Sequence, residues 1–394
     1  MNKKAMFMTR LFLLLFLISH VCLAADAKKT TGDQKTEARA IMDGVYDSFV
    51  KVIPYVYSDE KNGGLLLKDS QQKVELLKNL TDISDYFKSA RHVEYFQRPG
   101  FRPSLETINH HMDDTIRSVK NDNFAFAQKR MKALTALCIS CHSQLSESAS
   151  QNAFGTAINK AKRETFDSDF AYANYLFLVR RFSDSEKYFD LAIEKALKEN
   201  QEHELYSSLR KEISIHTKIA FNVKQGNQMI ARFEKDSRLP PLAKSSLMSW
   251  KKSLNKWKSF NPKKVKSIDR FIKTYLAPLE SEKGQTAGGE HDVTLLVASG
   301  VLSKYLNDHP KTPLAPEILY WLSIAERRLS NTYFFSLSDL YLKDCIKLYP
   351  KSRFAKKCYT EYAENIEFGY SGSSGTDIPV EEKQELERLK GYLK

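Results

Sequence analysis

The sequence Cys138-Ile139-Ser140-Cys141-His142 decides how the first part of the chain is expected to fold. It has the pattern C-x-x-C-H, which is typical of covalent haem attachment. Two thiols three positions apart lie on one face of a helical turn, where both can add to the vinyl groups of a haem. The histidine after the second cysteine is then placed to bind the iron. We therefore expect one c-type haem, held by Cys138 and Cys141 and ligated by His142.

Two other uses of these residues are open at this point. A redox-active thiol pair has the same spacing, but such a pair usually opens a helix, where the dipole lowers the thiol pKa. This pair follows a long helical run instead. Half of a zinc site would need a second ligand pair at a suitable spacing, and the next cysteines are distant, at Cys345 and Cys358.

The first 24 residues have the pattern of a cleaved export signal. Lys3, Lys4 and Arg10 precede a short apolar core over 11–21, and Cys22-Leu23-Ala24 offers small residues for cleavage near Ala24. Haem attachment to C-x-x-C-H takes place outside the bacterial cytoplasm, so signal and motif predict the same periplasmic location, with the envelope surface as an alternative. Residues 25–35 are polar and are expected to form a flexible leader.

Composition favours an all-α protein. The 394 residues include 15 Gly and 12 Pro, and no sustained alternation with period two is present. The formal net charge is +13, and loss of Lys3, Lys4 and Arg10 leaves about +10. Such a charge suits an acidic redox protein or a membrane surface, or it is a solvated basic face. Nucleic acid fits an exported protein poorly.

Apolar residues recur at helical spacing in four stretches between residues 36 and 148. The stretches cover 38–56, 70–90, 103–119 and 124–142, and Pro54 is expected to kink or end the first of them. Four amphipathic helices with short connections favour an up-down-up-down bundle with the haem motif at the end of its fourth helix.

This arrangement resembles the class II cytochromes c, the cytochrome c′ group. The resemblance covers residues 36–148 and consists of helix order, helix length and the position of Cys138, Cys141 and His142. It implies that a methionine early in the first helix can be the sixth iron ligand. Met42 occupies that position, and the rivals near the start of the third helix are Met112, His110 and His111. Among the arginines of the loop before the third helix, Arg98 and Arg102 are candidate partners for a haem propionate.

Residues 150–370 are predicted to form a second all-helical region. His309-Pro310-Lys311-Thr312 before Ala315 matches Tyr349-Pro350-Lys351-Ser352 before Ala355. These units resemble the tetratricopeptide-like repeats of periplasmic assembly proteins, whose stacked helices bind a peptide or protein partner. Residues 371–394 are expected to be a tail that ends in a short charged helix.

Cys345 and Cys358 remain as a pair once Cys22 leaves with the signal and two cysteines hold haem. An oxidising compartment favours a disulfide between them, because they lie on neighbouring helices across the turn at Tyr349-Pro350. Two separate buried thiols are the alternative.

Two functions are consistent with this sequence. One is an electron-transfer or haem-sensing protein with a repeat scaffold for a protein partner. The other is an enzyme or gas-binding protein with an open sixth iron site, acting on peroxide or nitric oxide. We favour the first, which is not an enzyme, because Met42 is available as a ligand and only one C-x-x-C-H is present.

The motif makes a prediction about mass. The mature chain should weigh one haem more than the chain cleaved near Ala24, and replacing both Cys138 and Cys141 with Ala should abolish covalent attachment. The same replacement at Cys345 and Cys358 should leave the haem in place. Intact-mass spectrometry measures all three proteins, and haem still bound in the first double variant would contradict the assignment.

Overall fold

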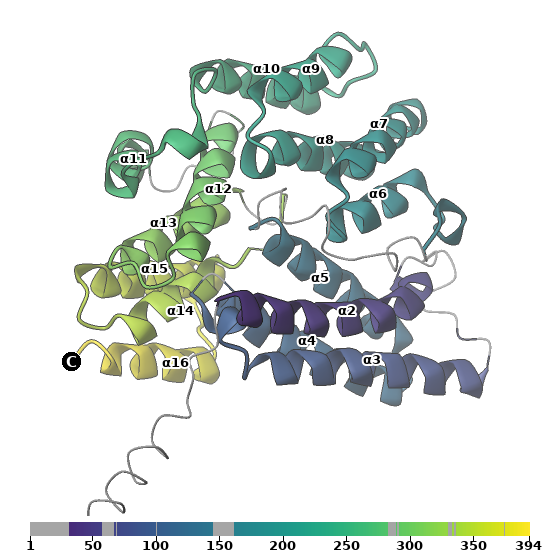
Figure 1. The fold of residues 1–394 in the computed structure, drawn as a ribbon, viewed down its shortest axis with the longest axis horizontal. Helices are drawn as coiled ribbons and strands as arrows, with labels where there is room; N and C mark the ends of the chain where they lie inside the picture. The colour runs from purple at the N-terminus through teal and green to yellow at the C-terminus, as the bar shows by residue number, and fades with distance from the viewer. Residues whose placement is uncertain are drawn as a thin grey trace, which may run out of the picture.

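The computed structural model describes residues 31–56, 67, 69–99, 101–144, 161–282, 289, 291–329, 333–334, 336–373 and 375–394. The predicted signal at 1–24 and most of the predicted leader lie outside these residues. In the described part the fold is all-helical apart from one short hairpin (Figure 1), which confirms the prediction of an all-α protein. No described helix is long and apolar enough to span a bilayer.

Four long helices form the N-terminal unit: α2 (Thr31–Val56), α3 (Ser70–Ala90), α4 (Arg102–Lys120) and α5 (Phe124–His142). Each packs on the next along the chain, and α5 also packs on α2. The Asp69 side chain caps α3 by accepting from Gln72 N at 2.8 Å, and Asn123 caps α5 in the same way. A short 3₁₀ helix, η2 (Glu94–Gln97), precedes α4.

The first helix begins earlier than predicted, and Pro54 lies within its last turn. It begins at Thr31, inside the segment expected to be a flexible leader, and it continues through Pro54 to Val56. Proline removes one helical hydrogen bond and crowds the preceding turn. Val52, Ile53 and Val56 are nevertheless almost fully buried, so core packing holds this last turn in place.

The C-terminal region, from residue 161 to Lys394, is built from consecutive helices that mostly pack on their neighbours in sequence. Its α-helices and strands are α6 (Asp169–Leu178), α7 (Phe182–Glu199), α8 (Glu202–Ser214), α9 (Val223–Phe233), α10 (Pro241–Lys256), α11 (Ile268–Tyr275), α12 (Asp292–Asp308), α13 (Ala315–Leu329), α14 (Ser338–Leu348), α15 (Arg353–Gly369), β1 (Ser371–Gly372), β2 (Gly375–Thr376) and α16 (Val380–Gly391). Shorter turns are η5 (Arg163–Thr165), the π-helix η6 (Ile215–Ile219), η7 (Pro262–Lys264) and η8 (Ala277–Glu282). The charged helix predicted at the end of the tail is α16.

The two repeats predicted from sequence correspond to α12 with α13 and α14 with α15. His309 and Tyr349 end the first helix of each pair with similar backbone angles, φ/ψ of −129°/63° and −131°/49°. Ala315 and Ala355 are both fully buried near the start of the second helix. A disulfide joins Cys345 on α14 to Cys358 on α15, with their Cα atoms 6.4 Å apart.

The C-terminal region returns to the N-terminal unit at two places. α6 packs on α5, and α14 packs on α4 (Figure 1). At the first place the hydroxyls of Tyr46 and Tyr175 are 2.7 Å apart. At the second, Arg102 Nε lies 3.8 Å from a carboxylate oxygen of buried Asp344. The buried apolar residues of both parts form one continuous core.

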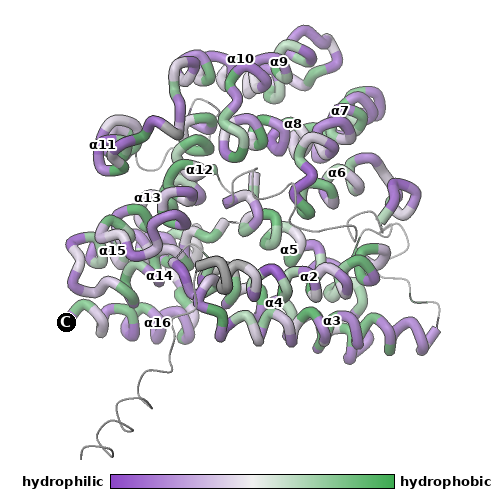
Figure 2. The backbone as a smooth tube through the Cα atoms, viewed as in Figure 1, coloured by the Kyte–Doolittle hydropathy of each residue, from purple (hydrophilic) through white to green (hydrophobic). Residues whose placement is uncertain are grey.

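α12 lies at the centre of the C-terminal region and is largely hydrophobic along its length (Figure 2). Gly300 of this helix lets it approach the π-helix η6, since a Cβ at this position would collide with the backbone carbonyl of Lys218 and with the ring of Phe221. The close contact therefore requires glycine at a position where helix propensity alone favours alanine.

This contact predicts opposite effects for two glycine replacements. Gly300→Ala should lower the free energy of unfolding by about 1–3 kcal/mol, because backbone must shift to relieve the overlap. Gly369→Ala, at the end of α15 with open space around it, should be neutral or stabilising by up to about 1 kcal/mol. Urea denaturation compares the two, and equal stability of both variants would contradict the close packing.

Candidate haem site

The last turn of α5 presents the motif residues. The helix ends at His142, where the backbone N–H of Ser143 bonds to Ile139 O at 2.9 Å. Cys138, Cys141 and His142 are therefore still in helical conformation at spacings of three and four residues, which place all three on one side of the helix. This is the arrangement that the sequence predicted for them.

One side of this turn lines an apolar pocket, here called the motif pocket. It is lined by Met42, Val45, Tyr46 and Phe49 of α2, Ile83 and Phe87 of α3, Leu134, Cys138 and His142 of α5, and Leu178 and Val179 at the end of α6. The pocket thus has walls from both the N-terminal unit and the C-terminal region. Sequence reasoning had assigned the haem site to residues 36–148 alone, so its wall from α6 is a structural finding.

His142 is oriented by a backbone carbonyl. Its Nδ1 lies 2.5 Å from Leu178 O, and because a carbonyl oxygen only accepts, Nδ1 must carry the hydrogen. Nε2 then keeps its lone pair for a metal. Burial lowers the pKa of His142 to about 4, an effect that the bond to Leu178 opposes and the charge of Arg180 adds to. The imidazole is therefore neutral near pH 7, as an iron ligand must be.

The Leu178 carbonyl is available because of how α6 ends. The last carbonyls of a helix have no partner within it. Arg180 takes the left-handed conformation, with φ of 64°, and the N–H of Arg181 bonds to Leu176 O at 2.8 Å. The last hydrogen bond of the helix end is thus made to the carbonyl of Leu176, whereas the carbonyl of Leu178 accepts from His142. A left-handed residue other than glycine costs about 1–2 kcal/mol, which the surrounding packing must offset.

The two motif cysteines are thiols, not a disulfide. Burial, with the charge of Cys141 adding to its effect, raises the pKa of Cys138 to about 12. A redox-active cysteine needs a lowered pKa, since the thiolate is the reactive form. The environment of Cys138 is therefore the opposite of what a thiol-redox pair requires, although it suits a thioether in an apolar pocket.

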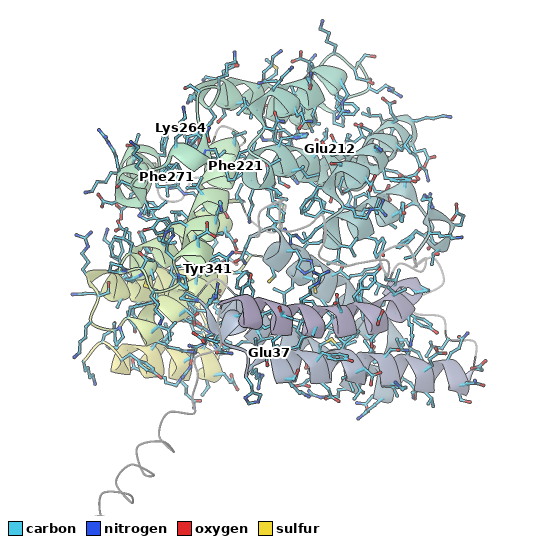
Figure 3. The ribbon with its side chains drawn as sticks, viewed as in Figure 1. Glu37, Glu212, Phe221, Lys264, Phe271 and Tyr341 are labelled. Carbon is cyan, nitrogen blue, oxygen red and sulfur yellow. A yellow bond between two sulfur atoms is a disulfide. The ribbon has the colours of Figure 1, made fainter. Side chains whose placement is uncertain are left out.

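Cys141 lies toward the junction of several elements. Burial raises the pKa of Tyr95, which lies in η2, and that of Tyr341, which lies on α14. In both cases the charge of Cys141 contributes to the increase. Tyr341 is labelled in Figure 3 and is fully buried. The motif thus lies where the N-terminal unit, α6 and α14 meet.

Met42 lines the same pocket as His142, whereas its rivals do not. Met112 is fully buried in the core, and His111 is buried close to Arg130 and Asp114. His110 is exposed, with Nε2 3.5 Å from a carboxylate oxygen of Asp114. Of the four candidate sixth ligands, Met42 is the one that the structure places beside the motif.

Arg98 and Arg102 contact the C-terminal region and do not line the pocket. The Arg98 guanidinium lies over the Tyr95 ring, 4.5 Å from its centre, and donates to Asn307 O at 3.3 Å. Arg102 is shared between Glu106, at 3.5 Å, and Asp344. Both arginines therefore have other roles in this structure, in holding the two parts together.

Arg180 is the charged residue near the motif that sequence reasoning missed. It directly follows the pocket residues Leu178 and Val179, and only 5% of it is exposed. Burial lowers its pKa to about 10, so it stays positively charged near pH 7. No local signal in the sequence distinguishes it, because its position depends on the packing of α6 against α5.

The donor set fits a covalently held haem. The Cys138 thiol, the neutral His142 imidazole and the Met42 thioether line one apolar pocket, Cys141 lies on the same helical turn outside its lining, and buried Arg180 follows the pocket residues in sequence. The enclosed space is about 50 Å³, compared with roughly 300–1,000 Å³ for pockets that hold drug-sized ligands. Binding would therefore require the pocket walls from α2 and α6 to move apart.

Comparison with known proteins adds no assignment, since no family model, curated protein or solved structure matches the chain. Among the described residues, no group of three or more His, Cys, Asp and Glu side chains is arranged to hold a metal ion.

His111 predicts how stability depends on pH. Burial, with Arg130 and His110 adding, lowers its pKa from 6.5 to about 4. Between these values the unfolded chain binds a proton that the folded chain does not, so stability falls as pH decreases through this range. His111→Gln should reduce that loss by up to about 3 kcal/mol.

The matched control is His110→Gln, because His110 is the exposed neighbour on the same helix. Urea denaturation at several pH values gives the change in the free energy of unfolding per pH unit for each protein. A loss of stability that is the same at every pH does not affect this comparison. Equal slopes for both variants would show that His111 does not titrate in this way.

Proposed function

We propose that the mature chain is an exported, periplasmic c-type cytochrome with one haem, held by Cys138 and Cys141 and ligated by His142. The observation that carries this proposal is the neutral His142, whose Nδ1 donates to Leu178 O and whose Nε2 therefore has the lone pair that a metal ligand needs. A metal-binding histidine commonly has its second nitrogen fixed by such a carbonyl. The raised pKa of Cys138 argues against the thiol-redox alternative.

We further propose that the N-terminal unit is a four-helix bundle of the class II cytochrome kind and that α6–α15 form a tetratricopeptide-like solenoid. The sequential packing of α2–α5, with α5 returning to α2, supports the first assignment. The matching helix ends at His309 and Tyr349 support the second. Stacked helix pairs of this type commonly bind a peptide or protein partner.

A bound haem would supply a redox-active iron, and the protein residues would set its environment. Cys138 and Cys141 would fix its position, and the Leu178 carbonyl would hold His142 in the required tautomer. A thioether from Met42 would favour electron transfer over ligand binding, because it occupies the sixth position and raises the reduction potential. Arg180 is better placed than Arg98 or Arg102 to offset the charge of a propionate.

Electron transfer, or sensing of redox state, is therefore the function we favour over peroxide or nitric oxide chemistry. The choice depends on Met42, which lines the motif pocket. With Met42 on the iron, the sixth position is closed to an external ligand. Without it, the pocket would expose an open iron site within apolar walls.

The sixth ligand can be tested with two methionine variants. The wild-type protein should be low-spin and show a thioether-to-iron charge-transfer band when oxidised. Met42→Ala should lose that band and bind carbon monoxide when reduced. Met112→Ala should keep the band, although it removes a fully buried side chain and should cost about 2–5 kcal/mol of stability.

Absorption spectra of the oxidised, reduced and carbon monoxide-treated proteins give the answer. An unchanged Met42→Ala spectrum, together with loss of the band in Met112→Ala, would move the ligand to Met112. A wild-type protein that is already high-spin and binds carbon monoxide would favour the gas-binding or enzymatic function instead.

A further inference from the structure

The positive charge of the chain is concentrated on α10, α11 and the segment between them. Residues 241–275 contain nine lysines and one arginine against a single acidic residue, Asp269. They therefore carry +9 of the formal +13 of the whole chain. A positive charge that serves only solubility would be spread over the whole surface, whereas most of the net charge of this chain lies in one part of the fold.

The lysines of α10 share one exposed face. Lys244, Met248, Lys251 and Lys252 recur at helical spacing and all are exposed, while the opposite side of the helix, with Trp250, is buried. Met248 lies among these lysines with 61% of its surface exposed. Exposed lysines continue beyond the helix; we call the basic face Lys244, Lys251, Lys252, Lys256, Lys258, Lys264 and Lys266.

Most of the basic face is not neutralised within the protein. Lys251 pairs with Glu234 at 2.8 Å. In the described ranges no acidic side chain forms an ion pair with Lys244, Lys256, Lys258, Lys264 or Lys266. Lys264, labelled in Figure 3, lies in η7 where the chain leaves α10 for α11. These ammonium groups are available to an external anionic surface.

We propose that the basic face docks the protein on an anionic lipid bilayer. Each lysine close to such a surface contributes about 1 kcal/mol, and exposed Met248 and Leu242 can enter the interfacial layer. Lysines are flexible point charges that suit lipid headgroups, whereas precise pairing with carboxylates of a protein favours arginine. The proposed export determines only which membrane the protein meets, and the rest of this proposal does not depend on it.

The position of the basic face favours a membrane over an acidic redox protein. α10 packs on α9 and α12, and Figure 1 shows it at the end of the molecule away from α2–α5. An electron carrier docked there would be separated from the motif pocket by the C-terminal region. A bilayer at the same place leaves the N-terminal unit accessible to soluble partners.

Vesicle co-sedimentation of the purified mature protein tests this proposal. Vesicles of equal parts phosphatidylglycerol and phosphatidylcholine should bind it at low salt, binding should weaken as salt is added, and pure phosphatidylcholine should not bind. Replacing Lys244, Lys256 and Lys264 together with Glu should weaken partitioning about 100-fold. The control triple variant, with Glu at Lys129, Lys198 and Lys356, changes net charge equally at exposed sites elsewhere and should bind nearly as wild type.

Direct contact is tested with Met248→Trp, whose indole emission should shift to the blue on anionic vesicles. Equal effects of the two triple variants, no binding to anionic vesicles, or binding only to soluble polyglutamate would each overturn the proposal. The assay does not need haem, so the protein with Ala at Cys138 and Cys141 should partition equally. An experiment that contradicts the haem proposal can therefore be distinguished from one that contradicts membrane docking.

Discussion

The hydrogen bond between His142 Nδ1 and the Leu178 carbonyl is the interaction on which the candidate site depends. It fixes the tautomer of the imidazole and joins the end of α5 to the end of α6. The Leu178 carbonyl can accept this bond because Arg180, in the left-handed conformation, ends α6 with a hydrogen bond from Arg181 N to Leu176 O instead. The chemistry available to the motif is thus determined by how a neighbouring helix ends.

The motif pocket consequently belongs to two parts of the chain. Tyr46 and Tyr175 join α2 to α6 through their hydroxyls, and Arg102 reaches Asp344 of α14. Burial raises the pKa of Asp344 to about 7, with Arg102 opposing the shift. Arg102 is partly exposed and also pairs with Glu106, so this contact is only partly shielded from water. Because Tyr46 itself lines the motif pocket, its contact with Tyr175 connects the C-terminal region directly to a wall of that pocket.

Local sequence patterns predicted the helices well and the junction poorly. The apolar spacing in α3 and the motif at the end of α5 depend on neighbours within a few residues, so both were predictable. The start of α2 at Thr31, within a polar segment, was not predictable from the apolar spacing, which begins at residue 38. Arg180 is beside the motif only because α6 packs on α5. The same holds for Arg102, which was expected near haem and contacts Asp344 instead.

Closure of the C-terminal region on both α5 and α4 has a consequence for the order of maturation. The Cys138 thiol is partly buried and lines the same pocket as Met42 of α2 and Leu178 of α6, so docking of α6 narrows the access to it. If haem is attached to Cys138, attachment would therefore be easier before the C-terminal region closes on the N-terminal unit. The rate at which α6 docks, relative to the rate of that attachment, would then set how much of the chain carries haem.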